Sequence, residues 1–119
     1  MLIELRVTAP VVPKPRPRVG RHKCYLPSRY TSWESSAVLD LVTQTKGIQG
    51  LPINYGIGLT IRLGGSCRGD LDNIIKSVCD VLVKAQVLQD DSLSIIRSIY
   101  ATWEKSRKPY CVIKITRVN

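Results

Sequence analysis

The chain of 119 residues has room for one domain with a single packed core, and its apolar fraction of 44% is typical of a folded protein rather than a disordered one. Eighteen Lys and Arg residues against nine Asp and Glu give a net charge of +9, which favours a polyanionic partner such as nucleic acid over mere solubility. No apolar run approaches the roughly 20 residues of a membrane-spanning helix, and the alternating start of the chain differs from a signal peptide.

The first half of the chain predicts one strand, an extended basic arm and one helix. Alternating apolar and polar side chains predict a half-buried strand over residues 2–8. Prolines then exclude helix over residues 9–30, which we interpret as a basic arm. Its candidate phosphate-binding residues are Lys14, Arg16, Arg18, Arg21 and Lys23. A capping box of Thr31 and Glu34, and Gly47 past the other end, bound a helix. Its predicted inward side chains are Trp33, Ala37, Val38, Leu41 and Val42.

The second half of the chain predicts strand, helix, strand and strand. Alternate apolar residues predict a strand over residues 56–63, and the loop GGSCRG leads from it into a helix over residues 71–85. This helix has a 3.6-residue apolar rhythm. Its predicted inward side chains are Leu71, Ile74, Ile75, Val78, Cys79, Leu82 and Ala85. Strands over residues 93–103 and 110–118 follow, joined by the turn EKSRKP and therefore expected to pair as a hairpin.

These elements predict a single small domain over residues 1–119, of the α/β or α+β class, with a mixed sheet of about four strands and two helices packed on it. Their order is strand, helix, strand, helix, strand, strand. Trp33 and Trp103 fall at apolar positions, so we expect both in the core rather than on a base-stacking surface. The cysteines are Cys24, Cys67, Cys79 and Cys111. They form no C-x-x-C pair, so we expect reduced, mostly buried thiols in a cytoplasmic protein.

An acidic cluster brackets the second predicted helix. Asp70 and Asp72 stand at its start, in RGDLDNIIKSVCD, and Asp90 and Asp91 follow its end. One interpretation is purely structural: Asp70 caps the helix, and Asp72 complements its dipole and pairs with Lys76, each for about 0.3–1 kcal/mol. This interpretation leaves the downstream pair and the basic surplus unexplained.

The other interpretation is a metal site at the helix start. Mg²⁺ prefers carboxylate oxygens, and two aspartates one residue apart at a strand-to-helix corner can face one ion. A phosphodiester bound there would meet Lys76, which can stabilise the reacting phosphorus, protonate the leaving oxygen or orient the water. Spacing alone leaves both interpretations open.

A resemblance favours the metal site. The segment RGDLDNIIKSVCDVLVKAQVLQDDS resembles the D-x-D-N-x-x-K-x-x-x-D-x-L core and the following D-D pair of the RusA family of Holliday junction resolvases. VVPKPRPR and YLPSRYTSWE also resemble the proline- and arginine-rich opening of many members. The matching segments cover roughly half of the chain in the family's order; the acidic core is specific, whereas the arm alone would be a weak signal.

The resemblance implies a homodimeric endonuclease that uses Mg²⁺, with Mn²⁺ as a substitute, to introduce paired nicks across a four-way DNA junction. The catalytic segment would be residues 68–91. The residues carried over are Asp70, Asp72 and Asp91 as metal-binding carboxylates and Lys76 as the catalytic lysine. Asp90 is the second choice, as a ligand or as support for its neighbour, and Arg68 is expected close to the scissile phosphate. The setting would be the cytoplasm of a bacterium, with a bacterial or phage gene.

The separation of the two acidic pairs is a difficulty for a site within one chain. A helix from Asp72 to Ala85 is about 20 Å long, and the six steps from Ala85 to Asp91 span at most about 20 Å. One hypothesis is a two-fold dimer with antiparallel helices, in which Asp91 of one subunit approaches Asp70 and Asp72 of the other. The family usually has Gly at the position of Gln86, so Gln86 should adopt a left-handed conformation at about 1 kcal/mol, or the helix should end differently.

Two other functions remain open from the sequence. A basic nucleic-acid-binding protein without catalysis would use the aspartates only for capping and ion pairs. A related phosphodiesterase would act on other branched DNA or on RNA with similar chemistry. Metal-dependent nicking of a synthetic junction tests the first alternative, and a panel of branched and linear substrates tests the second.

Overall fold

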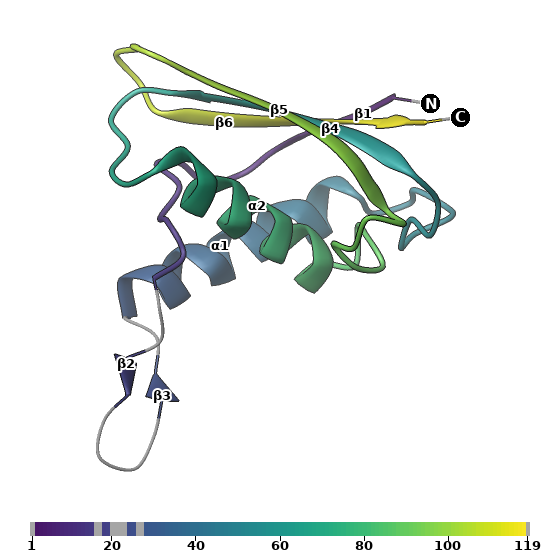
Figure 1. Ribbon diagram of the computed structural model, residues 1–119, viewed down its shortest axis with the longest axis horizontal. Coiled ribbons are helices and arrows are strands. Elements are labelled where there is room, and N and C mark those ends of the chain that lie inside the picture. The colour runs from purple at the N-terminus through teal and green to yellow at the C-terminus, as the bar shows by residue number, and fades with distance from the viewer. Residues whose placement is uncertain (1, 16–17, 20–23, 26–27, 119) are drawn as a thin grey trace.

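The computed structural model describes residues 2–15, 18–19, 24–25 and 28–118, and it has a four-stranded sheet with two helices on one face (Figure 1). The sheet strands are β1 (Leu2–Arg6), β4 (Ile57–Gly64), β5 (Ile96–Glu104) and β6 (Tyr110–Arg117). The helices are α1 (Ser28–Gln44) and α2 (Leu71–Lys84), and the short strands β2 (Arg18–Val19) and β3 (Cys24–Tyr25) pair in the basic arm. The predicted α+β class is confirmed. Within the described ranges, no helix combines the length and apolar character needed to cross a membrane.

The order of the strands corrects one expectation from the sequence. The sheet runs β1-β6-β4-β5, with β6 antiparallel to both neighbours and β4 parallel to β5. The prediction that β5 and β6 pair as a hairpin is wrong, because β4 lies between them. The apolar residues of β6 match those of β4, with Cys111 opposite Leu63 and Ile113 opposite Ile61, and all four are buried. The parallel pair needs a crossover connection, which α2 supplies.

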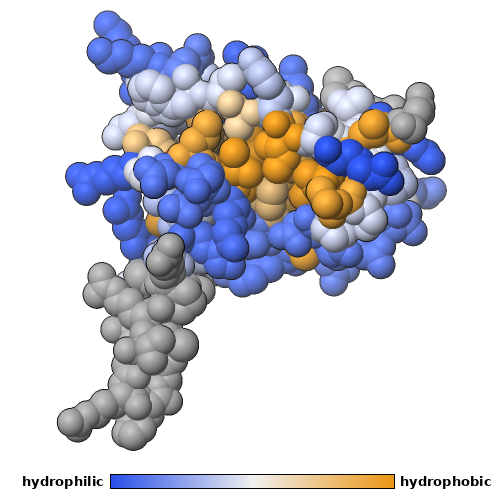
Figure 2. Space-filling view, viewed as in Figure 1, coloured by the Kyte–Doolittle hydropathy of each residue, from blue (hydrophilic) through white to orange (hydrophobic). Residues whose placement is uncertain are grey.

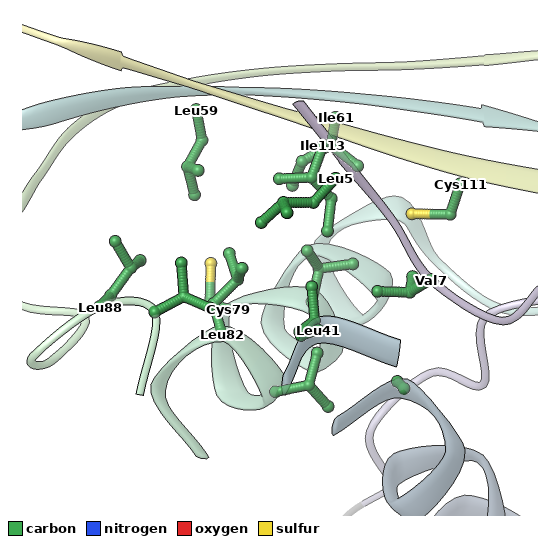
Figure 3. Packing of buried hydrophobic residues seen from close by; sticks show 14 of the residues in the cluster. Leu5, Val7, Leu41, Leu59, Ile61, Cys79, Leu82, Leu88, Cys111 and Ile113 are labelled. Carbon is green, nitrogen blue, oxygen red and sulfur yellow. The ribbon is translucent and has the colours of Figure 1, made fainter. Parts of the chain in front are cut away.

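The core lies between the sheet and the two helices. Alternate residues of β4 are buried against the helices, because successive side chains of a strand point to opposite faces. Figure 3 shows Leu59, Ile61 and Ile113 of the sheet above Leu82 of α2 and Leu41 of α1. Burying one such side chain is worth roughly 1.5–3 kcal/mol, so this layer holds α2, and the acidic residues at its start, in a fixed position.

Helix α1 begins earlier than the capping signal indicates. It starts at Ser28, and Thr31, the predicted cap, lies within the first turn and donates its hydroxyl to the Ser28 carbonyl at 3.0 Å. Glu34, the predicted capping partner, instead forms an ion pair with Lys84 of α2 at 2.7 Å. The capping box is therefore wrong, because Glu34 is used for a contact between the helices.

Helix α2 matches its prediction to within one residue, and its C-terminal end is a Schellman motif. The Val87 N–H donates to the Leu82 carbonyl and the Gln86 N–H to the Val83 carbonyl, both at 3.0 Å. Gln86 has a φ of 59°, so the predicted left-handed conformation is confirmed. The side chains of Val87 and Leu82 are fully buried and hold the chain where it turns back.

Some large apolar side chains predicted in the core are exposed. Trp33 is buried as expected, but Trp103 is 53% exposed, and Leu71 and Val42 are exposed too. Trp103 stands opposite the buried Leu63 in the β4–β5 register, so it shares the helix-facing side of the sheet. It remains uncovered because β5 is the edge strand. Figure 2 shows the resulting apolar band across α2 and the β5 edge.

Candidate metal and DNA site

The loop between β4 and α2 is held in place by both the sheet and the arm. Gly65 has a φ of +83°, and its carbonyl accepts the Trp103 indole N–H at 2.8 Å. Gly69 has a φ of +100°, and a β-carbon added there would lie 2.7 Å from the ring of Pro13. These close contacts place Asp70 at the helix start, beside the base of the basic arm.

The acidic residues at the start of α2 do not make the contacts that the structural interpretation requires. Asp70 occupies the N-cap position, but its side chain makes no capping hydrogen bond. Asp72 accepts the N–H of the adjacent Asn73 at 2.9 Å, and among the described residues no ion pair joins Asp72 to Lys76. All of these side chains are exposed. The two carboxylates and the ammonium are therefore available to a ligand from solution.

Asp91 lies on the same side of the molecule as Asp72 and Lys76. We call the site that they share the acidic hollow; it is lined by Asp72, Ile75, Lys76, Cys79, Asp91, Leu93, Ile96, Ser98 and Ile99. Burial raises the pKa of the Cys79 thiol to about 11, and the charge of Asp91 adds to the rise, which places that carboxylate near Cys79.

The path of the chain corrects the expectation that Asp91 emerges beyond the far end of α2. Asp91 shares the acidic hollow with the α2 residues from Asp72 to Cys79, which span about 10 Å along the axis, so it lies beside the helix and not beyond its end. The Schellman turn reverses the chain, and Gln89 then donates its N–H to the Ile53 carbonyl at 2.9 Å. These bonds direct the chain back toward the acidic hollow, which Asp91 lines.

The two aspartates of the downstream pair differ in what they bind. Asp90 accepts the Ser92 N–H at 2.8 Å, and hydrogen bonds from Ser92 lower the pKa of Asp90. Asp90 thus closes a local turn, a common use of aspartate, whereas Asp91 lines the acidic hollow. This difference supports Asp91 as the ligand and Asp90 as the residue that supports its loop.

The side chains of this region suit a hard cation. Asp70, Asp72 and Asp91 offer carboxylate oxygens, which Mg²⁺ prefers, and Mg²⁺ usually keeps several waters beside few carboxylates. In the described part of one chain, however, no three His, Cys, Asp or Glu side chains converge closely enough to hold a metal ion. The chemistry therefore fits Mg²⁺, whereas the described residues of a single protomer bring too few ligands to one point.

The base of the basic arm is attached to α2 beside the acidic hollow. The buried Ser77 hydroxyl donates to the Val12 carbonyl at 2.7 Å. Lys14, a predicted phosphate-binding residue, pairs with Asp80 at 2.6 Å, and their side chains are 29% and 18% exposed. Arg68 is exposed in the loop before α2. The other predicted contacts are Arg16, Arg21 and Lys23, which lie outside the described residues, and Arg18, of which only the backbone is described.

Sequence reasoning missed an apolar pocket beside Asp70 and Asp72. This pocket is a cavity of about 250 Å³ lined by Leu63, Cys67, Gly69, Leu71, Ile74 and Trp103. The apolar pocket and the acidic hollow both include residues of α2 and of β5. The sequence carried one signal for it, since Leu71 and Leu93 are large apolar residues placed directly among the aspartates.

Two comparisons with known proteins bear on these residues. Residues 9–116 match the family model described as endodeoxyribonuclease RusA. The chain is also similar to a protein named crossover junction endodeoxyribonuclease RusA from Aquifex aeolicus (strain VF5). The two are 36% identical over 95 residues, which cover 76% of this chain and 73% of the relative. The range matched by the family model includes the basic arm and every aspartate described above.

Proposed function

The chain belongs to the RusA family of endodeoxyribonucleases, and we propose that it cuts four-way DNA junctions as a Mg²⁺-dependent homodimer. The observation that carries the proposal is that Asp72, Lys76 and Asp91 line one hollow in a protein with a net charge of +9. A nuclease needs both features, because carboxylates hold the metal and the surrounding basic residues hold the DNA. A DNA substrate, together with the similarity to a bacterial protein, supports a location in the cytoplasm of a bacterial or phage-infected cell.

The side chains that would hold Mg²⁺, or Mn²⁺ in its place, are Asp70, Asp72 and Asp91, with Asp90 as the second choice. When bound, such an ion neutralises charge on a phosphodiester and makes an adjacent water more acidic. Lys76 lies one helical turn beyond Asp72, and its ammonium has no ion pair among the described residues. It would donate to a nonbridging oxygen or to the leaving oxygen of the cut strand, while Arg68 binds a neighbouring phosphate.

The basic arm is assigned to the phosphates of the junction. Its candidate contacts are Lys14, Arg16, Arg18, Arg21 and Lys23. The ion pair between Lys14 and Asp80 fixes the base of the arm on α2, next to the acidic hollow. An ammonium has three N–H donors, so Lys14 keeps donors for a phosphate while it holds Asp80.

We assign each complete site to two subunits. Asp72 and Asp91 line one hollow, but three metal-ligating side chains do not converge within the described part of one chain. A two-fold dimer with antiparallel α2 helices would bring Asp91 of one subunit to Asp70 and Asp72 of the other. The same symmetry would supply two cuts of matching polarity, which resolution of a four-way junction requires.

Mixing two inactive variants tests the shared site. In a mixed dimer of Asp72→Asn and Asp91→Asn, shared sites place both lesions in one site and leave the other intact. Activity should therefore reappear on mixing, to about a quarter of the wild-type value, since about half of the dimers are mixed and each has one intact site. Sites contained within single subunits would each carry one lesion, and the mixture would remain inactive.

Nicking of a synthetic four-way junction tests the activity itself. Wild-type protein with Mg²⁺ should introduce paired nicks into the junction, and the Asp72→Asn variant should bind the junction without cutting it. A protein that binds junctions but never cuts them, whatever the metal, would instead support the non-catalytic alternative. Preferential cutting of linear duplex or of RNA in a substrate panel would reject the four-way junction as the substrate.

A further inference from the structure

Leu93 is a large apolar side chain placed in solvent beside the candidate site. It follows Asp91 by two positions and is 84% exposed, more than any other large apolar residue in the described chain. Ile99 and Trp103 of the β5 edge are also exposed and extend the apolar surface. A contiguous apolar patch with a polar rim usually marks a contact with another protein surface.

The apolar pocket has the size and lining to receive such a side chain. It lies against the helix start that carries Asp70 and Asp72, with Leu71 and Trp103 among its walls. The hydrogen bond from the Trp103 indole N–H to the Gly65 carbonyl holds one wall in place, so the pocket is formed before anything enters it.

A two-fold axis perpendicular to α2 at Ile75, in the first half of the helix, would relate Leu93 of one subunit to the apolar pocket of the other. Ile75 lies midway between Leu71 and Cys79, about 6 Å along the axis from each. An axis perpendicular to α2 at Ile75 therefore superposes the level of Cys79 in one subunit on the level of Leu71 in the other. Asp91 and Cys79 line the same hollow, so the symmetry mate of Asp91 would lie near Leu71, which stands between Asp70 and Asp72.

We propose that Leu93 of each subunit inserts into the apolar pocket of the other and thereby delivers Asp91 to the partner's Asp70 and Asp72. The inference rests on the homodimer proposed above and adds the contact that sets its register. The contact of Leu93 with the pocket would fix how the two subunits align. The carboxylates of both subunits would then be in position before a metal ion binds.

The charges at this contact also match. Asp70 and Asp72 of one subunit would face Asp90 and Asp91 of the other, and these four carboxylates repel one another. Arg68 and Lys76, together with one divalent cation, carry the equivalent positive charge. Mg²⁺ should therefore tighten the dimer, and EDTA should loosen it, even in the absence of DNA.

Disulfide trapping tests the contact directly, because the pocket already contains Cys67. Leu93→Cys in a Cys24→Ser background is oxidised with copper–phenanthroline and run on a non-reducing gel. A covalent dimer should form, peptide mapping should join positions 93 and 67 of different chains, and adding Cys67→Ser should abolish it. Leu39→Cys is the matched control, since Leu39 is an exposed leucine on α1, 65% accessible, in a different region of the surface. Absence of the 93–67 bond, or a 93–93 bond in its place, overturns the proposal.

Sedimentation supplies a second measurement. A buried leucine contributes about ten- to one-hundred-fold to an association constant, and each dimer has two such contacts. Leu93→Asp should therefore raise the dimer Kd by at least about one hundred-fold, whereas Leu39→Asp should leave it unchanged. A Trp103→Ala variant that loses junction affinity but keeps the wild-type dimer Kd would show that the pocket takes a nucleobase, and would reject the leucine contact.

The two proposals fail separately. Trapping and sedimentation need neither DNA nor catalysis, so an intact 93–67 bond in a protein that never cuts would reject the nuclease function and keep the contact. A wild-type protein that cuts junctions, while the Leu93→Cys variant gives no such bond, would reject the contact alone.

Discussion

Replacing Gln86 by glycine tests the turn that returns Asp91 to the side of α2. Gln86 has a φ of 59°, and a left-handed conformation costs a residue with a β-carbon roughly 1–2 kcal/mol. Glycine avoids this cost but makes the unfolded chain more flexible by about 0.4–1 kcal/mol. The net stabilisation by Gln86→Gly should therefore be about 0.5–1 kcal/mol. With an unfolding entropy of about 2.1 cal/mol/K per residue over 119 residues, this free energy corresponds to a rise in Tm of roughly 2–4 °C.

Thermal unfolding followed by circular dichroism measures this change, and urea titration gives the free energy independently. Gln86→Ala is the control, because alanine keeps the β-carbon and should give no comparable rise in Tm. Junction nicking by Gln86→Gly should equal that of the wild type, since the Schellman hydrogen bonds use backbone atoms. The expected cost would be refuted if the Tm of Gln86→Gly were at or below the wild-type value, or if Gln86→Ala raised the Tm equally. Either result would show that the left-handed conformation of Gln86 costs no measurable free energy.

Three other predictions concern the basic arm. Ser77→Ala leaves the partly buried Val12 carbonyl without its hydroxyl donor and should lower the free energy of unfolding by about 1–3 kcal/mol in urea titration; no loss would mean that water replaces the hydroxyl. Lys14→Gln and Asp80→Asn, alone and together, should show a coupling of about 1 kcal/mol, and purely additive effects would mean that the pair contributes nothing. Arg16→Ala combined with Arg18→Ala should reduce the salt slope of junction binding by about two log units per log unit of salt, and an unchanged slope would assign the arm another role.

Helix α2 and its acidic residues could be predicted because their signals are local. Ile74, Val78 and Leu82 repeat at helical spacing, and all three are buried as that spacing requires. The left-handed Gln86 could likewise be inferred, since a helix end constrains φ over a single residue. Ser77 carried a local signal of its own, because a hydroxyl between buried apolar positions needs a nearby acceptor.

The strand order and the exposed edge could not be predicted, because they depend on contacts between distant segments. The turn before Tyr110 suggested a hairpin, but the pairing of β6 is decided by the matching apolar rows of β4 and β1. The apolar position of Trp103 suggested burial in the core, which is wrong, although the side chain does share the helix-facing side of the sheet with Leu63. Periodicity does not report how far a layer of helices extends, so it could not show that β5 is left uncovered.

The exposed β5 edge and the acidic cluster have one explanation if two copies of the chain meet there. Edge strands are normally protected by charge, by covering segments or by irregular geometry, yet β5 is nine residues long and exposes Ile99 and Trp103. Two subunits of net charge +9 also repel each other, and screening weakens this repulsion only beyond about 8 Å at physiological salt. Aspartates placed at the contact lower the positive potential where the subunits approach most closely. A strongly basic nuclease can therefore keep its acidic residues at a self-contact because they offset the repulsion there while also holding a metal ion.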